Sequence, residues 1–197
     1  EDLRQKVREK RIGNTFLFAV DASGSMGARE RMRAVKGAIF YMLQEAYQKR
    51  DRVGMIAFRR DKADLLLPIT RSVDLAQKRL AEMPTGGKTP LADGLALSLQ
   101  TLALLNKRDS ELEPILIVVT DGRANAVHEG EKEPVAAAIN IAEKIAKAKI
   151  TSVVIDTESD FIKLGIAKKL AAAMQANYYT LQRLSKENII HIVRNLN

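Results

Sequence analysis

The chain has 197 residues, of which 46% are hydrophobic and 28% charged, as is typical of one globular domain with a sizeable core. It has no cysteine, which excludes disulfides and thiolate metal sites, and its apolar runs are shorter than the roughly 18 residues of a membrane span. The net charge is +8, but no aromatic residues interleave with the basic ones near the start, so we expect a solvated segment or a face for an acidic partner, and no nucleic acid.

Strands and helices are predicted to alternate along most of the chain. In order, we expect a strand at 16–20, a helix at 28–49, strands at 53–58 and 63–67, a helix at 73–82, a helix at 90–106, a strand at 115–120, a helix at 133–149, a strand at 150–155, a helix from Ser159 or Asp160 to 174, a strand at 177–181 and a helix from Ser185 onward. Pro68 suggests that the third strand ends near an edge. Apolar strands that alternate with helices predict an α/β fold, a doubly wound and mostly parallel central sheet with helices on both faces.

Three oxygen-bearing side chains follow the first predicted strand. Asp21, Ser23 and Ser25 alternate at every second position, so their side chains point the same way in an extended loop. Carboxylate and hydroxyl oxygens are ligands for hard ions, and no cysteine or histidine lies nearby. The pattern therefore predicts a site for Mg²⁺ or Mn²⁺.

A second carboxylate and a further hydroxyl complete the predicted site. Asp121 follows the strand at 115–120, and the carboxyl ends of parallel strands share one edge of the sheet, where such folds bind ligands. Thr89 lies in a glycine-rich loop and is expected to contribute its hydroxyl to the ion. Its alternative role is to cap the helix that Pro90 begins.

These motifs resemble the von Willebrand factor A (integrin inserted-domain) family, with its metal-ion-dependent adhesion site. The resemblance rests on Asp-x-Ser-x-Ser after the first strand, a threonine in a glycine-rich loop and Thr-Asp-Gly after a later strand. It implies a Rossmann-type α/β fold and, as metal ligands, Asp21, Ser23, Ser25, Thr89 and Asp121.

Further motifs are similar to the C-terminal domain of magnesium-chelatase D subunits and related tetrapyrrole chelatase subunits. They are Val-Asp-Ala-Ser-Gly-Ser-Met-Gly at 20–27, Gly-Gly-Lys-Thr-Pro-Leu at 86–91 and Thr-Asp-Gly-Arg at 120–123. In that family an AAA+ ATPase-like domain and an acidic linker precede the domain. The resemblance implies that residues 1–13 are a basic segment leading into the domain and that residues 14–197 form it.

The expected function follows from the open coordination of the ion. Mg²⁺ takes six ligands and keeps water in unfilled positions, so it can accept a carboxylate from a partner protein. The resemblance implies that the partner is the large chelatase subunit or the AAA+ ATPase, and that the domain couples an ATPase ring to the chelatase. The alternative is a generic metal-dependent adhesion module. Residues expected at the rim of the partner site are Met26, Lys88, Arg123 and Asn125.

An enzymatic role for this chain finds no support in its motifs. Gly87-Lys88-Thr89 imitates the end of a phosphate-binding loop, but position 82, where that loop needs glycine, is Glu82. His128 and His191 lie outside the motif loops, and we interpret them as solvated and structural. We expect no catalytic site here, although the chain can be a non-catalytic part of an ATP-dependent complex.

The remaining expectations concern Asp156, the last predicted helix and the location of the protein. Asp156 also ends a strand, and we interpret it as a turn residue. The last predicted helix, which includes Ile189 and Leu196, could move on ligand binding as in related domains, but we favour a static helix. The absence of cysteine and of a signal-peptide pattern leads us to expect a cytoplasmic protein.

Overall fold

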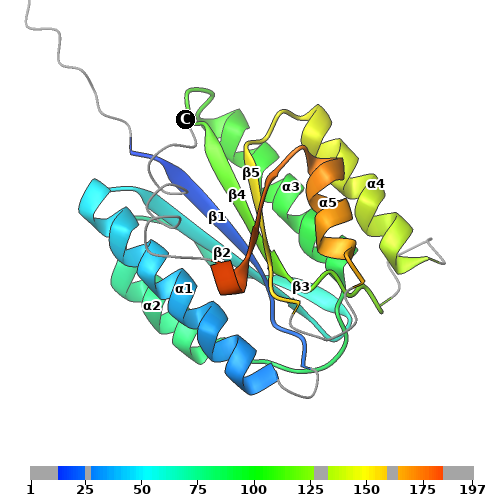
Figure 1. The fold of residues 1–197 in the computed structure, drawn as a ribbon. Coiled ribbons are helices and arrows are strands. Elements are labelled where there is room, and N and C mark those ends of the chain that lie inside the picture. Colours follow the sequence, from blue (N-terminus) through cyan, green and yellow to red (C-terminus); the bar gives the residue numbers. More distant parts are fainter. Residues whose placement is uncertain (1–12, 25–27, 127–132, 159–163, 184–197) are drawn as a thin grey trace, which may run out of the picture.

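The computed structural model describes residues 13–24, 28–126, 133–158 and 164–183. They form a six-stranded sheet in the order β3-β2-β1-β4-β5-β6, with helices on both faces (Figure 1). The strands are β1 (Thr15–Asp21), β2 (Arg52–Arg59), β3 (Lys62–Thr70), β4 (Pro114–Thr120), β5 (Ser152–Asp156) and β6 (Asn177–Thr180). The predicted doubly wound α/β fold is therefore confirmed. No helix among the described residues is both long and apolar enough to cross a bilayer.

The sheet is parallel except for its edge strand β3. β1 lies between β2 and β4 and runs parallel to both, whereas β3 runs antiparallel to β2. A turn at Arg60, with φ of 59°, and Asp61 joins β2 directly to β3, and so short a connection permits only an antiparallel pair. Pro68 lies inside β3, where the pairing register shifts, and does not end the strand as predicted. An edge strand tolerates the missing N–H.

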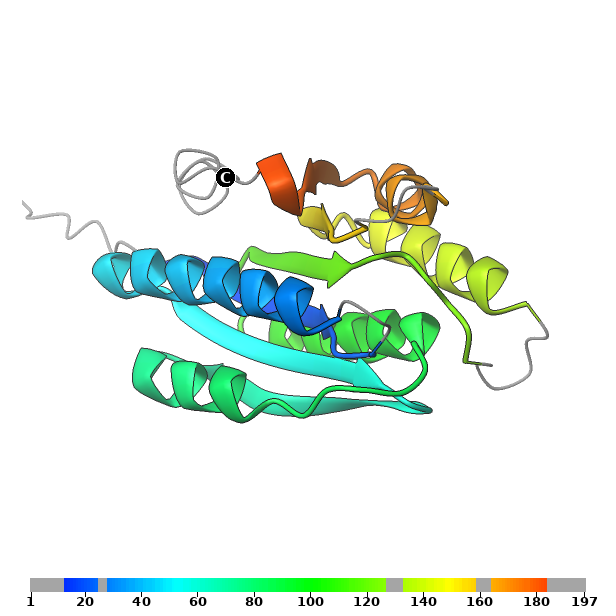
Figure 2. The same cartoon turned by 60° about the horizontal axis from the view of Figure 1, so that its bottom comes forward.

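Two layers of helices cover the two faces of the sheet (Figure 2). α1 (Ala28–Lys49) and α2 (Val73–Glu82) cover the face that includes Phe16 and Phe18 of β1, with α2 over β2 and β3. α3 (Leu91–Arg108), α4 (Pro134–Lys147) and α5 (Ile166–Met174) pack against the other β1 face, which includes Leu17. Because β1 is buried on both sides, all its residues between Thr15 and Asp21 are apolar.

Most predicted elements agree with the structure, and α5 differs most. The predicted helix begins at Ser159 or Asp160, which lie outside the described residues, but Leu164 and Gly165 are not helical and α5 begins at Ile166. The buried Glu158 carboxylate accepts hydrogen bonds from the backbone N–H groups of Leu164 and Gly165, at 2.7 and 3.3 Å, and so fixes the entry to the helix. The final predicted helix from Ser185 lies outside the described residues.

Candidate metal centre

Asp21 and Asp121 lie beside each other at the carboxyl edge of the sheet. Asp21 is the last residue of β1, Asp121 directly follows β4, and the pairing of Val20 with Val119 sets these two strand ends side by side. The strand order reverses at β1, because β2 lies on one side of it and β4 on the other. Doubly wound sheets bind ligands at this switch point. The structure thus brings the two predicted carboxylates together from positions 100 residues apart.

Hydrogen bonds fix the orientation of the Asp21 carboxylate. Its Oδ1 accepts from the backbone N–H of Ser23, and its Oδ2 accepts from the hydroxyl of Thr120, each at 3.0 Å. The Thr120 hydroxyl in turn accepts from the backbone N–H of Gly122 at 3.0 Å. Thr120 is completely buried and was not predicted as a site residue, although it is the first residue of the Thr-Asp-Gly motif.

The two hydroxyls of Ser23 and Thr89 meet at the same edge. Thr89 Oγ1 donates to Ser23 Oγ at 2.8 Å, and the Thr89 backbone N–H donates to Asn125 Oδ1 at 2.7 Å. The alternative of Thr89 as a helix cap is wrong, because the cap position of α3 is Pro90 and no side chain bonds to this helix start. Four predicted ligands, namely Asp21, Ser23, Thr89 and Asp121, therefore share one site.

Close backbone contact joins the two loops that carry these hydroxyls. The N–H of Gly24 donates to Gly87 O at 3.3 Å, and the N–H of Gly86 donates to Ala22 O at 2.8 Å. A Cβ on Gly24 would lie 2.8 Å from Gly86 Cα, so only glycine allows the loops to approach this closely. Ser25 and Met26, a predicted ligand and a predicted rim residue, lie outside the described residues.

The negative charge on Asp21 is unfavourable beside Asp121 when no cation lies between them. Burial is the main cause that raises the pKa of Asp21 to about 7, and the negative charge of Asp121 raises it further, against the lowering effect of the hydrogen bonds from Ser23 and Thr120. Although Asp21 is only partly buried by surface area, protein atoms surround its carboxylate closely. A cation between the two carboxylates would remove this penalty.

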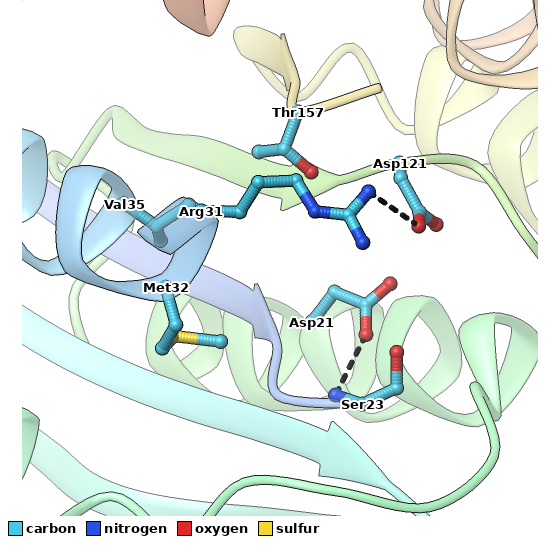
Figure 3. A pocket seen from close by; sticks show the side chains of 7 residues that line it. All are labelled: Asp21, Ser23, Arg31, Met32, Val35, Asp121 and Thr157. Atoms are coloured by element: carbon cyan, nitrogen blue, oxygen red, sulfur yellow. Dashed lines mark hydrogen bonds and ion pairs between the residues drawn. The ribbon is translucent and has the colours of Figure 1, made fainter. Parts of the chain in front are cut away.

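A small cavity lies next to the paired carboxylates (Figure 3). Its volume is about 30 Å³, enough for an ion or a water molecule, and it is lined by Asp21, Ser23 and Asp121 on the sheet side and by Arg31 and Met32 of α1. Two carboxylates and two hydroxyls are a donor set that suits Mg²⁺ or Mn²⁺. The described residues hold no cluster of three or more acidic, histidine or cysteine side chains, so hydroxyls and water would have to complete the coordination.

Two arginines accompany Asp121. Arg31 Nη1 lies 3.9 Å and Arg123 Nε 3.7 Å from Asp121 Oδ2, and the Arg31 side chain reaches across the cavity (Figure 3). Arg31 was not predicted. The available signal is that Arg31 and Val35 are four residues apart on the buried face of the helix. Of the predicted rim residues, Lys88 and Asn125 are exposed, Arg123 contacts Asp121, and Asn125 accepts a hydrogen bond from the Thr89 backbone N–H.

The comparisons with known proteins agree with this fold. The sequence profile described as von Willebrand factor type A domain matches residues 16–124, more than half of the chain. The chain therefore belongs to the von Willebrand factor type A domain family. Among solved structures it is similar to the SpRpn10 VWA domain, with a TM-score of 0.62, 13% identity, and coverage of 94% of this chain and 97% of that one.

The relatives found by sequence include magnesium-chelatase subunits. An uncharacterised protein of Methanocaldococcus jannaschii is 46% identical over 87% of this chain and 98% of its own length. The magnesium-chelatase 67 kDa subunit of Heliobacterium mobile is 36% identical over 98% of this chain. The chain spans 30% of that subunit and 32 to 34% of four further magnesium-chelatase subunits that it matches. It is thus a domain of the kind that forms about a third of these subunits.

Proposed function

We propose that this chain is a metal-dependent protein-interaction domain of a D-type subunit of a magnesium or cobalt chelatase in tetrapyrrole biosynthesis. A divalent ion, Mg²⁺ or Mn²⁺, is held by Asp21, Ser23, Ser25, Thr89 and Asp121. The observation that carries the proposal is the paired carboxylates of β1 and β4, with two hydroxyls beside them and a cavity at their side.

The charge of the site favours an acidic partner residue. Two carboxylates balance a divalent ion, and the guanidinium groups of Arg31 and Arg123 then leave the site positive. When bound, the ion supplies an electrophilic coordination position that a carboxylate oxygen can fill. The chain's own residues orient that position: Thr120 and Ser23 hold Asp21, and Asn125 holds the Thr89 loop.

The sequence relatives support a partner from a chelatase complex. Because the sequence relatives include magnesium-chelatase subunits, we propose that the acidic residue belongs to the large chelatase subunit or to an AAA+ ATPase subunit. Residues 14–197 would be the interaction domain, residues 1–13 the segment leading into it, and the cytoplasm its location. The domain would transmit the ATPase cycle to the chelatase without a catalytic site of its own.

The test is the interaction of the domain with purified chelatase subunits from the same genome, measured by biolayer interferometry with Mg²⁺ and with a chelator. The proposal predicts Mg²⁺-dependent binding that Asp21→Asn abolishes, with circular dichroism showing that the variant is folded. Binding that ignores both Mg²⁺ and the substitution would contradict the proposal. Binding only to surface or matrix proteins would favour the adhesion alternative.

A further inference from the structure

A groove between α1 and α2 begins at the candidate metal centre. The metal cavity shares Ser23 and Met32 with a neighbouring hollow of about 260 Å³, and this hollow shares Lys36 with a second one of about 570 Å³. The two helices contact each other and lie side by side in Figure 1. The three hollows are therefore neighbours that follow one another along α1, away from the paired carboxylates.

The chemistry of the groove changes along its length. The hollow next to the metal centre is lined by the cations Arg29, Arg33 and Lys36, with no carboxylate among its described lining residues. The hollow further along exposes mainly apolar surface, although Asp74 and Lys78 also line it. It contains Phe40, which is 42% exposed although it is a large hydrophobic residue. A ligand that complements both parts carries negative charge near the ion and apolar side chains beyond it.

Lys36 joins the two helices that border the groove, and the space beside Gly37 is open. Lys36 Nζ donates to the carbonyl oxygens of Ala81 and Met83, at 2.9 and 3.5 Å, which ties α1 to the end of α2. Next to Lys36, a Cβ built on Gly37 would meet no atom within 4 Å. Glycine inside a helix costs about 1 kcal/mol relative to alanine, and no packing contact in the groove requires its small size.

We propose that this groove binds an extended segment of the partner protein in which acidic residues are followed by apolar ones. The proposal rests on the proposed function, because the first acidic residue of the segment is the one that reaches the ion. From Met32 to Phe40 the helix rises about 12 Å, at about 1.5 Å per residue. An extended chain covers that length in about four residues, so the apolar pair follows the first acid by about four positions.

The test uses a labelled peptide, Glu-Ser-Glu-Ser-Leu-Phe, and fluorescence anisotropy with Mg²⁺ present. A second peptide with serine in place of Leu-Phe tests the apolar hollow, and a third with glutamine in place of the first glutamate tests the ion. We expect the loss of Leu-Phe to weaken binding about tenfold, which corresponds to about 1.4 kcal/mol. Equal affinity for the first two peptides, or no binding of the first, would overturn the inference.

Variants of the domain distinguish the groove from the metal centre. Gly37→Glu places bulk and negative charge in the groove and is expected to weaken binding of the first peptide about tenfold or more. Gly37→Ala should bind as the parent does, and so should Leu104→Glu, which changes an exposed leucine of α3 on the other side of the sheet. Mg²⁺-induced thermal stabilisation should be the same in all three variants.

The outcomes separate failure of the inference from failure of the proposed function. If Asp21→Asn abolishes binding of the chelatase subunits but Gly37→Glu does not weaken it, the proposed function stands and the groove is not used. If neither substitution has an effect, both fail. If sedimentation velocity shows a dimer of the parent chain that Gly37→Glu dissociates, the groove binds a second copy and the inference is overturned. Displacement of the peptide by a single-stranded oligonucleotide regardless of Mg²⁺ would also overturn it.

Discussion

The two ends of the sheet each hold a buried carboxylate, and their surroundings differ. At the amino edge, Asp51 directly precedes β2, is 2% exposed, and accepts a hydrogen bond from the backbone N–H of Asn14 at 2.8 Å. Burial raises its pKa, while the Asn14 N–H and the charge of Lys49 lower it. At the carboxyl edge, Asp21 faces a second carboxylate and two hydroxyls. At the amino edge the buried carboxylate of Asp51 only holds neighbouring backbone in place. At the carboxyl edge further oxygen ligands lie beside Asp21, and these make it a candidate site.

The largest expected effect is the loss of metal response in Asp21→Asn. The amide keeps the size of the side chain and an acceptor for the Ser23 N–H, but removes the charge that holds the ion. We expect Mg²⁺ affinity to fall about 100-fold or more. Without Mg²⁺ the variant should be at least as stable as the parent, because a buried charge next to Asp121 is gone. Calorimetric titration and thermal denaturation measure the two effects, and a retained Mg²⁺ response would remove Asp21 from the site.

A smaller effect on the same carboxylate is expected from Thr120→Val. Valine has nearly the same shape but loses the hydroxyl that donates to Asp21 and accepts from Gly122. Groups that orient a ligand without touching the ion change metal affinity by about 10- to 100-fold, and we expect a loss near the lower end. Thr15→Val, at the opposite end of β1, is the matched control and should leave Mg²⁺ affinity unchanged. Unchanged affinity in Thr120→Val would mean that the hydroxyl does not orient Asp21.

Substitution of Asp51 tests whether the amino edge and the metal centre are independent. Asp51→Ala leaves the buried N–H of Asn14 without this acceptor and should lower the free energy of unfolding by about 1–3 kcal/mol. Its Mg²⁺-induced stabilisation should equal that of the parent chain. Urea denaturation with and without Mg²⁺ measures both quantities. A loss of Mg²⁺ response would show that the two edges are not independent.

The smallest effect concerns the Tyr178–Asp156 pair between β6 and β5. The Tyr178 hydroxyl donates to Asp156 Oδ2, and burial, this bond and the nearby carboxylates raise the pKa of Tyr178 from 10.0 to about 12. The associated stability is fully present below pH 10 and is lost as the pH rises through about 12. Tyr178→Phe should lower stability at neutral pH by about 1 kcal/mol and flatten the decline between those pH values. Parallel pH profiles for the two proteins would contradict this assignment.

The sequence predicted the parts of the molecule that depend on regular patterns. Apolar runs and helical periodicity identified β1, α1 and β4, and the carboxyl-edge rule brought Asp21 and Asp121 together. The strand at 63–67 was predicted, but its antiparallel direction was not, because strand direction depended on the two-residue turn at Arg60 and Asp61. The start of α5 was misplaced because its entry is set by the nonlocal carboxylate of Glu158.

The supporting residues of the site escaped prediction for a similar reason. Thr120 is the last residue of a fully buried strand, so the sequence suggests a core residue. Only the structure shows that its hydroxyl donates to Asp21. Asn125, which was expected at the rim, is exposed, and it also accepts a hydrogen bond from the Thr89 backbone N–H that the sequence alone did not indicate. Arg31 differs from Arg29 and Arg33 only by the helix face that it occupies, which places it in the cavity. Ligand types were readable from motifs, whereas the contacts that orient them depend on the fold.

The most direct measurement is the location of a bound divalent ion in crystals of the chain grown with Mn²⁺, from anomalous scattering. The account predicts one strong peak in the cavity, within coordination distance of Asp21, Ser23 and Asp121 oxygens, that is absent in Asp21→Asn crystals. A well-ordered site without a peak, or a peak only at another part of the surface, would contradict a metal centre at the carboxyl edge of β1 and β4.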